Sequence, residues 1–459
     1  MFNIMPHQEV MADTWVKNGI LFNQSDPGTS KTVGAIHGFN KFNTSNKRLL
    51  VLAPLSILKA SWADDIQKYE GFSYSIAHGS PKKRREAFEL GADIVIMNHD
   101  GVNWLVKNMD VMESITHVVI DESTAFKNAN TQRSKALVQV TRNTPYIQVM
   151  SGTPIPKTIL DIWHQVFLLD RKNFKESERL GLFYQFRNTT CDSIPVPGIN
   201  TQQWMDRPGA EEFVADKIKD ISVRFRLEDC IEIPEHQVID YFIPPPKWLM
   251  DQYKELEKTS FLELDNGSLT PINAAVRAKK LLQLLSGAVY DESGRVLKVH
   301  EERYKLVLEL VTQRKHSLVA FNYRHEVENL VDHASKQNIS YAIIDGSIRP
   351  KKRTEAVRAF QAGDLQTIFA HPQSAGHGLT MTKGTTTIWT SPTYNAEHYK
   401  QFNHRIYRNG QRQRTQTINV GYEGTKEVLA YANVSGKLEN QHNLLDLMFK
   451  LTPQGVAHV

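Results

Sequence analysis

A run of small residues that ends in lysine and threonine carries the strongest chemical signal in the sequence. The run is Asp26, Pro27, Gly28, Thr29, Ser30, Lys31 and Thr32. An apolar stretch precedes it and a helix-like stretch follows it, which is the layout of a phosphate-binding loop. In such a loop, backbone N–H groups and the N-terminus of the helix hold the phosphates. We expect Lys31 to reach the β- and γ-phosphates of a nucleotide and the Thr32 hydroxyl to hold Mg²⁺.

Ser30 occupies the position before the lysine, where such a loop is expected to have glycine. Serine adopts the unusual backbone angles of such a loop less readily than glycine does. We therefore expect Ser30 to affect the rate of hydrolysis more than nucleotide binding. Taken alone, the motif also fits a turn with a helix cap.

An acidic pair, Asp121 and Glu122, ends the apolar run His117–Ile120. At the carboxyl end of a parallel strand, both carboxylates would project toward a ligand crevice. There Asp121 would hold Mg²⁺, and Glu122 would orient or deprotonate the attacking water. An exposed acidic pair is the alternative, and the phosphate-binding motif upstream argues against it.

Two arginines near the C-terminus, Arg405 and Arg408, are three residues apart. A helix would place them on one face. Facing a phosphate, they would neutralise the charge of the transferred phosphoryl group, as arginine fingers do. A solvated basic helix is the alternative interpretation.

Short apolar runs of strand length are expected to form the strands that position these residues. They alternate with helix-like stretches, which predicts an α/β fold with parallel sheets that are apolar on both faces. The runs are Leu49–Pro54, Asp93–Met97, His117–Ile120, Tyr146–Met150, Leu318–Phe321, Tyr341–Ile344, Thr367–Ala370, Thr387–Trp389 and Thr417–Val420.

Two segments, one in each half, repeat the same pattern of strand, Gly-Ser turn, basic helix and strand. His78–Phe88 and Asp345–Phe360 carry this pattern. We expect two copies of one α/β lobe, with coincidence as the alternative. The segment from about 157 to 297 has a mainly helical periodicity, so we divide the chain into lobe 1 (1–230, with a helical insertion at about 157–230), a helical linker (231–297) and lobe 2 with a helical tail (298–459).

The composition excludes several classes of protein. A chain of 459 residues exceeds what one core usually organises. Two cysteines cannot form a disulfide framework, and no signal peptide or bilayer-spanning run is present. We expect a cytoplasmic protein. The net charge of +5 permits nucleic-acid binding without requiring it.

Together these features resemble the Swi/Snf-type branch of the superfamily-2 helicases and translocases, over about Pro6 to Val420. Asp26–Thr32 matches the Walker A motif, and Asp121-Glu122 matches Walker B. Pro6-His7-Gln8 resembles the motif that reads adenine, with Gln8 as the reader. The chain departs from the family at Ser30, at Ser123-Thr124 and at Thr380.

The remaining family motifs follow in the family's order. Leu52–Ser56 with Trp62 resembles the first DNA-contacting motif, and Ser151–Pro154 resembles the motif that senses nucleotide state. Val223–Arg226 resembles the stretch that enters the inter-lobe region, and Ser374–Thr380 resembles motif V. Motif VI is matched by Gln401, Arg405, Arg408, Gly410 and Gln411.

The resemblance implies two RecA-like lobes in tandem with helical insertions between them, ATP and Mg²⁺ as cofactors, and DNA as partner. ATP would bind between the lobes, and Gly378 would join the residues that contact it. Lys31, Asp121, Glu122, Arg405 and Arg408 would carry out hydrolysis. DNA would contact Pro54, Ser56, Lys82, Lys83, Arg84, Ser151, Gly152, Thr153, Asn322, Ser347, Lys351, Lys352, Arg353, Ser374 and Gly376.

Such a protein would move on or remodel DNA, and the compact build resembles bacterial and phage-encoded members. A role in DNA repair or recombination follows only by analogy with the family. Two alternatives remain: an RNA helicase of the same superfamily, and a nucleotide-dependent DNA clamp with little hydrolysis, which Ser30 suggests.

Overall fold

The computed structural model describes residues 3–154, 158–173, 175–195, 202–262, 279–290, 295–375, 379–432 and 434. The chain divides into two compact units. Unit 1 is built around Met1–Asp192 and Trp204–Glu232, and unit 2 around Ile233–Leu438. Among the described residues, no helix is both long and apolar enough to cross a membrane.

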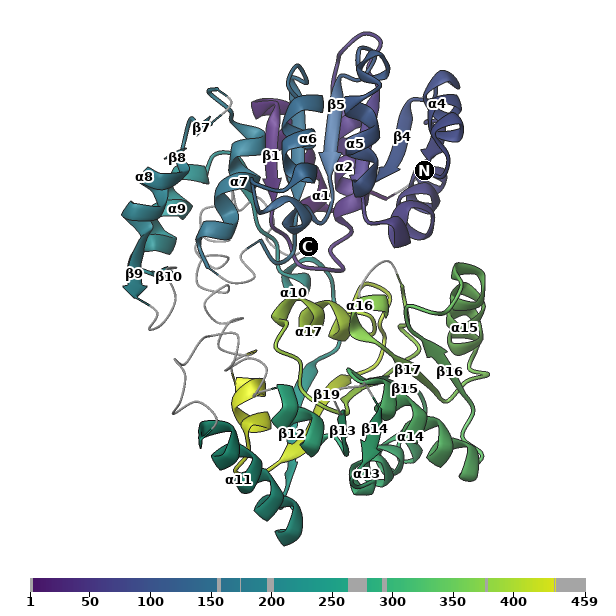
Figure 1. Ribbon diagram of the computed structural model, residues 1–459. Coiled ribbons are helices and arrows are strands. Elements are labelled where there is room, and N and C mark those ends of the chain that lie inside the picture. Colours follow the sequence, from purple (N-terminus) through teal and green to yellow (C-terminus); the bar gives the residue numbers. More distant parts are fainter. Residues whose placement is uncertain are drawn as a thin grey trace. The chain divides into compact units, whose positions relative to one another are not determined.

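Unit 1 is organised by a seven-stranded sheet in which every neighbouring pair of strands is parallel (Figure 1). In spatial order the strands are β11 (Ser222–Val223), β1 (Ile20–Asn23), β6 (Tyr146–Met150), β5 (His117–Ile120), β2 (Leu49–Ala53), β4 (Ile94–Asn98) and β3 (Tyr74–Ala77).

Both faces of this sheet are buried, because helices cover each of them. Alternate residues of each strand point to opposite faces, so each strand contributes apolar side chains to both. In β2, Leu50 and Leu52 join one apolar cluster, whereas Leu49 and Val51 join the other. The helices α1 (Pro6–Asn18), α2 (Lys31–Lys41) and α3 (Asp64–Tyr69) cover one face. The other face is covered by α4 (Pro81–Glu89), α5 (Val102–Val106), α6 (Gln132–Val140) and α7 (Leu160–Leu169).

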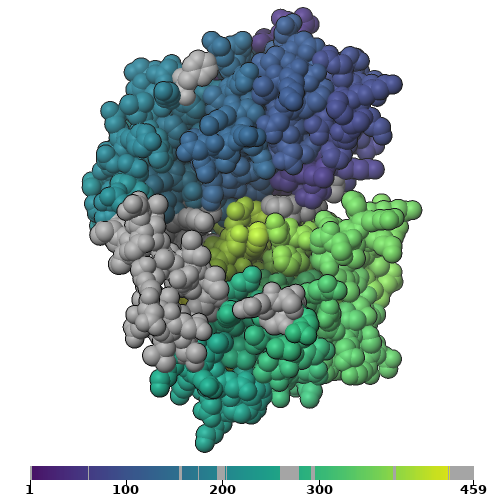
Figure 2. Space-filling view, viewed as in Figure 1, coloured from purple at the N-terminus to yellow at the C-terminus, as the bar shows by residue number. Residues whose placement is uncertain are grey.

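Smaller elements complete unit 1, whose atoms, coloured purple to teal, form a closely packed surface in Figure 2. They are the hairpin β7 (Glu176–Ser177) and β8 (Gly181–Leu182) and the helices α8 (Phe183–Thr190), α9 (Ala210–Ile218) and α10 (Leu227–Cys230). The strands β9 (Cys191–Pro195) and β10 (Gln202–Asp206) pair with each other and belong only in part to unit 1.

Unit 2 contains a six-stranded parallel sheet. In spatial order its strands are β12 (His236–Ile243), β19 (Thr415–Tyr422), β18 (Thr386–Trp389), β15 (Ser317–Ala320), β17 (Thr367–Ala370) and β16 (Tyr341–Ile344). One face packs on α13 (Glu302–Thr312) and α14 (Arg324–Lys336), and the other on α15 (Pro350–Ala362) and α17 (Ala396–Asn403). The remaining elements are α11 (Lys247–Leu262), α16 (Pro372–Ala375) and the hairpin β13 (Ala288–Tyr290) and β14 (Val296–Lys298).

Every strand-length run predicted from the sequence coincides with a strand, so the predicted fold class of two parallel α/β sheets is confirmed. The predicted repeat is also present. β3, α4 and β4 lie at one edge of the first sheet, and β16, α15 and β17 lie at one edge of the second. In both copies the two strands pair directly and the connecting helix begins at proline, whose missing N–H is tolerated in a first helical turn.

The expectation of a mainly helical segment from 157 to 297 was wrong in part. This segment also contains strands. β11 and β12 are each the edge strand of one of the two large sheets, and β7 to β10 form two separate two-stranded sheets. β12 follows β19 in parallel from His236↔Thr415 to Ile243↔Tyr422. Of the predicted helical tail, the structure describes helical residues at 426–432 and 434, and the rest lies outside the described residues.

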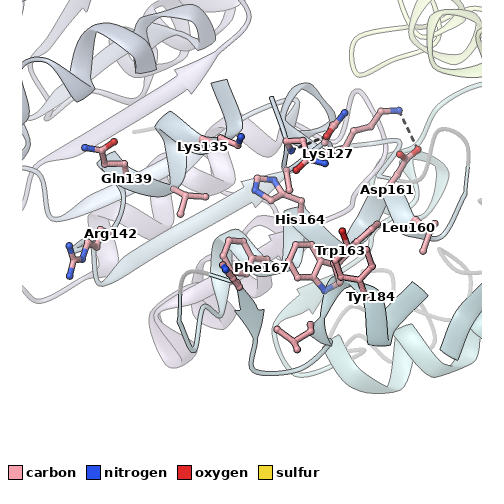
Figure 3. A pocket seen from close by; sticks show the side chains of 17 residues that line it. Lys127, Lys135, Gln139, Arg142, Leu160, Asp161, Trp163, His164, Phe167 and Tyr184 are labelled. Atoms are coloured by element: carbon pink, nitrogen blue, oxygen red, sulfur yellow. Dashed lines mark hydrogen bonds and ion pairs between the residues drawn. The ribbon is translucent and has the colours of Figure 1, made fainter. Parts of the chain in front are cut away.

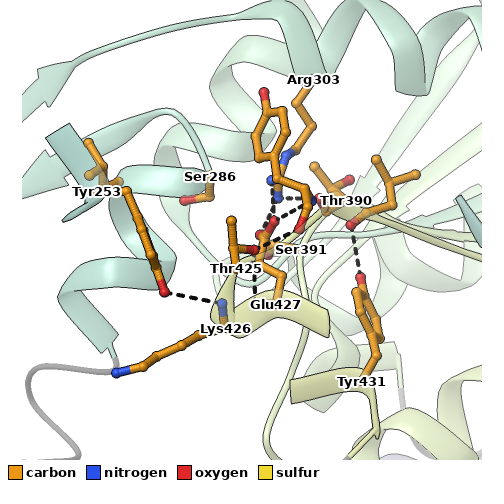
Figure 4. A network of polar contacts seen from close by, with 12 residues as sticks. Tyr253, Ser286, Arg303, Thr390, Ser391, Thr425, Lys426, Glu427 and Tyr431 are labelled. Atoms are coloured by element: carbon orange, nitrogen blue, oxygen red, sulfur yellow. Dashed lines mark hydrogen bonds and ion pairs between the residues drawn. The ribbon is translucent and has the colours of Figure 1, made fainter. Parts of the chain in front are cut away.

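A buried ion pair joins distant parts of unit 2 (Figure 4). Arg303 of α13 donates from both terminal nitrogens to Glu427, at 2.6 Å each, and also to the carbonyl oxygen of Thr390. Glu427 accepts a further hydrogen bond from the Tyr422 N–H at 2.9 Å. Both side chains are at most 1% exposed. The pair therefore ties the chain after β19 to α13 and to the end of β18.

We expect Glu427→Gln to destabilise unit 2 by about 3–5 kcal/mol, because Arg303 would keep its charge in a buried site without a counter-ion. Urea denaturation, with hydrogen exchange of the β18 and β19 amides as a local probe, measures this. The neighbouring Lys426→Gln removes a partly exposed pair with Glu257 and should cost less than about 1 kcal/mol. Equal losses in the two variants would contradict the prediction.

A buried carboxyl, Glu326, holds the turn between β15 and α14. Its Oε2 accepts from the N–H groups of Asn322 and Tyr323, at 2.6 and 3.0 Å. Burial raises the pKa of Glu326 to about 7, although these hydrogen bonds lower it. The folded state therefore prefers the protonated form, and the stability of unit 2 should fall as pH rises from about 4.5 to about 7.

We expect Glu326→Gln to raise the free energy of unfolding by about 2–3 kcal/mol at pH 8.5. One amide oxygen can accept both backbone hydrogen bonds, and the buried charge is removed. At about pH 4.5 the two proteins should be equally stable, because Glu326 is then protonated in the folded state. Denaturation curves at both pH values test this, and a gain of the same size at both would be inconsistent with a titrating Glu326.

Candidate functional site

The predicted phosphate-binding loop connects β1 to α2 in unit 1. Gly28 has a φ of 93°, and Ser30 lies in the left-handed region with φ 55° and ψ 45°. A side chain raises the energy of this conformation, whereas glycine adopts it readily. Ser30, where the sequence departs from the expected glycine, therefore has a backbone conformation that glycine would adopt with less strain.

We expect Ser30→Gly to keep ATP turnover at or above the wild-type rate and to stabilise unit 1 by up to about 1 kcal/mol, since released strain is partly offset by the flexibility of glycine in the unfolded chain. Ser30→Val should cost about 1–2 kcal/mol, because a β-branched residue fits a positive φ poorly. Thermal unfolding and steady-state turnover of the three proteins check this. A Val variant as stable and active as the Gly variant would contradict it.

Lys31 lies over its own loop. Its Nζ donates to the carbonyl oxygens of Ser25 and Asp26, at 2.7 and 3.0 Å. Burial lowers the pKa of Lys31, and the charges of Glu122 and Asp121 oppose this shift. The ammonium group and the acidic pair thus lie close enough to influence each other's charge, as a shared phosphate site requires.

Asp121 follows β5 directly and is buried. Its Oδ2 accepts from the indole N–H of Trp62 at 3.0 Å, and its carbonyl oxygen accepts from His99 at 2.8 Å. Burial, and next the charge of Glu122, raise the pKa of Asp121, whereas Lys31 lowers it. Glu122 has a left-handed backbone, with φ 49° and ψ 55°. This turn directs the chain away from the sheet directly after the acidic pair.

Thr32 lies on the first turn of α2, where its hydroxyl oxygen is 3.5 Å from that of Ser61. Trp62, next in sequence to Ser61, donates to Asp121. The two predicted Mg²⁺ ligands, Thr32 and Asp121, therefore contact consecutive residues of the segment after β2. A hydroxyl and a carboxylate are oxygen ligands that suit Mg²⁺ when phosphates and water supply the rest.

Gln8 and His7, on the first turn of α1, both contact the loop. The amide of Gln8 donates to the Ser30 carbonyl oxygen at 3.4 Å, and His7 Nε2 donates to the Thr29 carbonyl oxygen at 2.9 Å. Both side chains are 1% exposed. The residue expected to read adenine is thus positioned against the loop expected to hold phosphates.

A buried ion pair that the sequence did not reveal also holds the loop. Arg224, which follows β11, donates to Asp26 Oδ1 at 2.8 Å and to the Gln24 carbonyl oxygen at 2.8 Å. The N–H of Leu227 donates to Asp26 Oδ2 at 3.3 Å. Asp26 thereby joins the loop to the residues that follow β11. The two charges are 198 residues apart, so no local pattern connects them.

Ser151, Gly152 and Thr153 follow β6 and pack beside the same loop. A Cβ added at Gly152 would lie 2.9 Å from Pro27 Cδ, so only glycine fits there without a shift. The next residue, Pro154, accepts a hydrogen bond at its carbonyl oxygen from the amide of Gln165, which also accepts one from Ser123. This motif therefore lies between the loop and the residues that follow the acidic pair.

The arginine motif lies in unit 2, and the expectation that one helix carries both arginines was wrong. α17 ends at Asn403, and residues 404–410 form turns. The two side chains nevertheless converge: Arg405 and Arg408 each donate to the Leu379 carbonyl oxygen at 3.2 Å. Gln411 fixes this turn by donating to the carbonyl oxygens of Thr382, Gly384 and Ile406.

The motif V loop is described only in part. Ser374 lies in α16 and is partly buried, and Thr380 is exposed. Gly376 and Gly378 lie outside the described residues.

The basic side chains expected to contact DNA lie at the repeated edge of each sheet. Lys82 and Lys83 on α4, and Lys351 and Lys352 on α15, are exposed, whereas Arg84 and Arg353 are partly buried. Arg353 donates to the Asp345 carbonyl oxygen at 3.1 Å. Ser56 and Ser347 are exposed, and Pro54 is partly buried.

Asn322 has an internal role in unit 2. Its amide donates to the carbonyl oxygens of Ser391 and Pro392 and to the Ser391 hydroxyl. Its side chain thus connects the end of β15 to the segment after β18.

The comparisons with known proteins agree with this set of motifs. The model of the SNF2-related domain matches residues 8–195, and that of the helicase conserved C-terminal domain matches residues 302–410. "Putative protein p41" of Acyrthosiphon pisum secondary endosymbiont phage 1 is 27% identical, over 82% of this chain and 82% of its own length.

Two cellular relatives and one solved structure are also similar. An "Uncharacterized ATP-dependent helicase" of Mycoplasma pneumoniae is 22% identical over 84% of this chain. The human "DNA annealing helicase and endonuclease ZRANB3" is 23% identical over 92%. The chain spans 36% and 38% of their respective lengths. The structure entitled "Sulfolobus solfataricus SWI2/SNF2 ATPase core in complex with dsDNA" is 18% identical, with a TM-score of 0.43 and coverage of 99% of this chain and 98% of that one.

The residues matched by the first model include the phosphate-binding loop and the acidic pair, and those matched by the second include both arginines. The order and content of the motifs therefore agree with the sequence prediction. The chain belongs to the Snf2-type family of superfamily-2 helicases and translocases, and its use of ATP follows from that membership.

Proposed function

We propose that this protein is a DNA-dependent ATPase that couples ATP hydrolysis to movement along DNA or to its remodelling. The observation that carries the proposal is the arrangement in unit 1, where Lys31 begins α2 after the loop that follows β1, and the buried Asp121 follows β5 of the same parallel sheet, with each charge affecting the pKa of the other. Relatives named as an ATP-dependent helicase and a DNA annealing helicase support the choice of substrate and partner.

Each residue of unit 1 has a distinct proposed role. When the nucleotide binds, Lys31 gives up its hydrogen bonds to the carbonyl oxygens of Ser25 and Asp26 and donates to phosphate oxygens instead. Gln8 hydrogen-bonds the adenine. Thr32 and Asp121 would hold Mg²⁺, which would supply positive charge to the phosphate oxygens. Glu122 accepts a proton from the attacking water or orients it.

For unit 2 we propose that Arg405 and Arg408 stabilise the charge that develops on the transferred phosphoryl group. Their donation to one carbonyl oxygen supports a shared target, because the two guanidinium groups already converge. ATP would then favour a closed arrangement of the units, and hydrolysis would release it.

For DNA we propose contacts through the repeated basic helices, α4 and α15. Lys83, Lys351 and Lys352 are exposed, and none of them has an acidic partner among the residues that the structure describes. Lysines on phosphates give affinity without sequence specificity, and that affinity falls with salt. We propose duplex or branched DNA as the partner, since one relative is named for DNA annealing.

The test is ATP turnover of the full chain with no nucleic acid and with single-stranded, duplex, forked and four-way DNA, and with RNA. We expect at least tenfold stimulation by duplex or branched DNA, lost in Lys31→Ala. Stimulation by RNA alone would favour an RNA helicase.

The strained Ser30 specifically motivates a second candidate, a nucleotide-dependent clamp that hardly hydrolyses ATP. In that case the wild type would turn over ATP no faster than Lys31→Ala while both still bind DNA. Turnover of Ser30→Gly separates the two, because a clamp limited only by loop strain would gain activity.

A further inference from the structure

Unit 1 has a groove of about 1230 Å³ between α6, α7 and the start of α8. None of its described lining residues belongs to the phosphate-binding loop or to the acidic pair. Figure 3 shows Trp163 and Phe167 of α7 on one side of the groove, with Lys135 and Gln139 of α6 on the other. It is therefore a separate feature of this unit, and the proposed ATP chemistry does not use it.

The floor of the groove is aromatic and preformed. The rings of Trp163 and Phe167 stack at 5.1 Å with an interplanar angle of 9°, and Phe183 packs edge-on against Trp163 at 5.4 Å. The indole N–H of Trp163 donates to the Gly181 carbonyl oxygen at 3.1 Å. Tyr184, at the rim, is 68% exposed. Leu182, which also lines the groove, is 38% exposed, so apolar surface is open above this floor, as in a pocket that receives an apolar side chain.

The rim of the groove is basic. Its lining contains four basic residues, Lys127, Lys135, Arg142 and Lys175, and one acidic residue, Asp161. Asp161 pairs with Lys127 at 3.2 Å. Lys135 and Lys175 are exposed, and neither has an acidic partner within the described part of the chain. Arg187 adds a further cation, 5.0 Å from the centre of the Tyr184 ring. Positive potential at the rim favours an acidic ligand.

We propose that this groove binds an acidic amphipathic segment of a partner protein, with a large apolar side chain against Leu182 and Tyr184 above the aromatic floor and carboxylates at Lys135 and Lys175. The floor favours a peptide over nucleic acid. Stacking on several bases needs a row of exposed ring faces, whereas Trp163 and Phe167 are only 4% and 3% exposed and Tyr184 alone among the described lining rings is exposed.

The test starts with a library of random 12-residue peptides selected on the full-length protein. An enriched peptide, labelled with fluorescein, is then titrated by anisotropy against the wild type, Lys135→Glu/Lys175→Glu and Tyr184→Ala. Lys305→Glu/Lys315→Glu makes the same change of charge at exposed lysines of unit 2 and is the matched control. A duplex oligonucleotide is titrated against the same proteins.

We expect enriched peptides that combine acidic residues with one or two large apolar residues. Their affinity should fall at least tenfold in Lys135→Glu/Lys175→Glu and at least threefold in Tyr184→Ala, with less than a twofold change in the control. Failure to enrich any peptide, or enriched peptides that bind all four proteins equally, would overturn the proposal. Loss of duplex affinity in Lys135→Glu/Lys175→Glu with peptide binding unchanged would also overturn it. Because these readouts are independent of ATP turnover, they are separable from the proposed function.

Discussion

Asp121→Asn is expected to lower ATP turnover at least about a hundredfold and leave unit 1 folded. The substitution removes the negative charge proposed to hold Mg²⁺. It keeps an oxygen that can accept the hydrogen bond from Trp62 Nε1, which reaches Asp121 Oδ2 at 3.0 Å in the wild type. The loss should therefore appear in turnover, with no loss of folded protein. Steady-state hydrolysis with saturating duplex DNA measures it, and near-UV circular dichroism monitors the fold.

The Mg²⁺ dependence distinguishes a metal ligand from a residue that acts on water. Asp121→Asn should need more Mg²⁺ for half-maximal turnover, because one ligand has lost its charge. Glu122→Gln should lose turnover at an unchanged Mg²⁺ requirement, because Glu122 is proposed to act on the water. Asp100→Asn, at an exposed carboxylate after β4, is the control and should behave as the wild type. If Asp121→Asn kept more than a tenth of wild-type turnover, its proposed role would be wrong.

Strands of the two sheets could be predicted where both faces are buried. β2 sends Leu50 and Leu52 into one cluster and Leu49 and Val51 into the other, so its whole sequence is apolar. β12 could not be recognised in this way, because most of its residues lie exposed at a sheet edge. β11 has only two residues, Ser222 and Val223, and hydrophobic periodicity needs a longer run.

The candidate site likewise has parts that the sequence could predict and parts that it could not. Local motifs predicted the loop, the acidic pair and the arginines as candidates, because their proposed chemistry depends on residues close together in sequence. The contact of Arg224 with Asp26 depends on the pairing of β11 with β1, which a local pattern does not encode. The same holds for Trp62 and Asp121, which are 59 residues apart. Long-range hydrogen bonds of this kind position the motifs, and the tertiary structure was needed to find them.

The arginine motif shows how a correct grouping can rest on a wrong local structure. The spacing of Arg405 and Arg408 suggested two side chains on one helical face, but α17 ends before both. They converge because Leu379 presents one carbonyl oxygen to both guanidinium groups. Arg405 also donates to the Gln401 carbonyl oxygen at 2.8 Å and is buried, so its removal would disturb the turn as well. Arg408 is only partly buried, so its substitution tests the proposed chemistry with less effect on structure.

Arg408→Ala is expected to lower ATP turnover about a thousandfold or more, the usual contribution of an arginine finger. Nucleotide affinity should change much less than turnover, because most of the groups proposed to bind ATP, including Gln8, Lys31 and Thr32, lie in unit 1. Arg408→Lys should recover little, since an ammonium cannot reproduce the planar, two-pronged donation of a guanidinium. Turnover and binding of a fluorescent ATP analogue are measured together. Arg412→Ala, at an exposed arginine of the same segment, is the control. If Arg408→Ala matched that control in turnover, or lost affinity as steeply as turnover, Arg408 would not act on the transition state. The charge that stabilises phosphoryl transfer would then have to come from another residue.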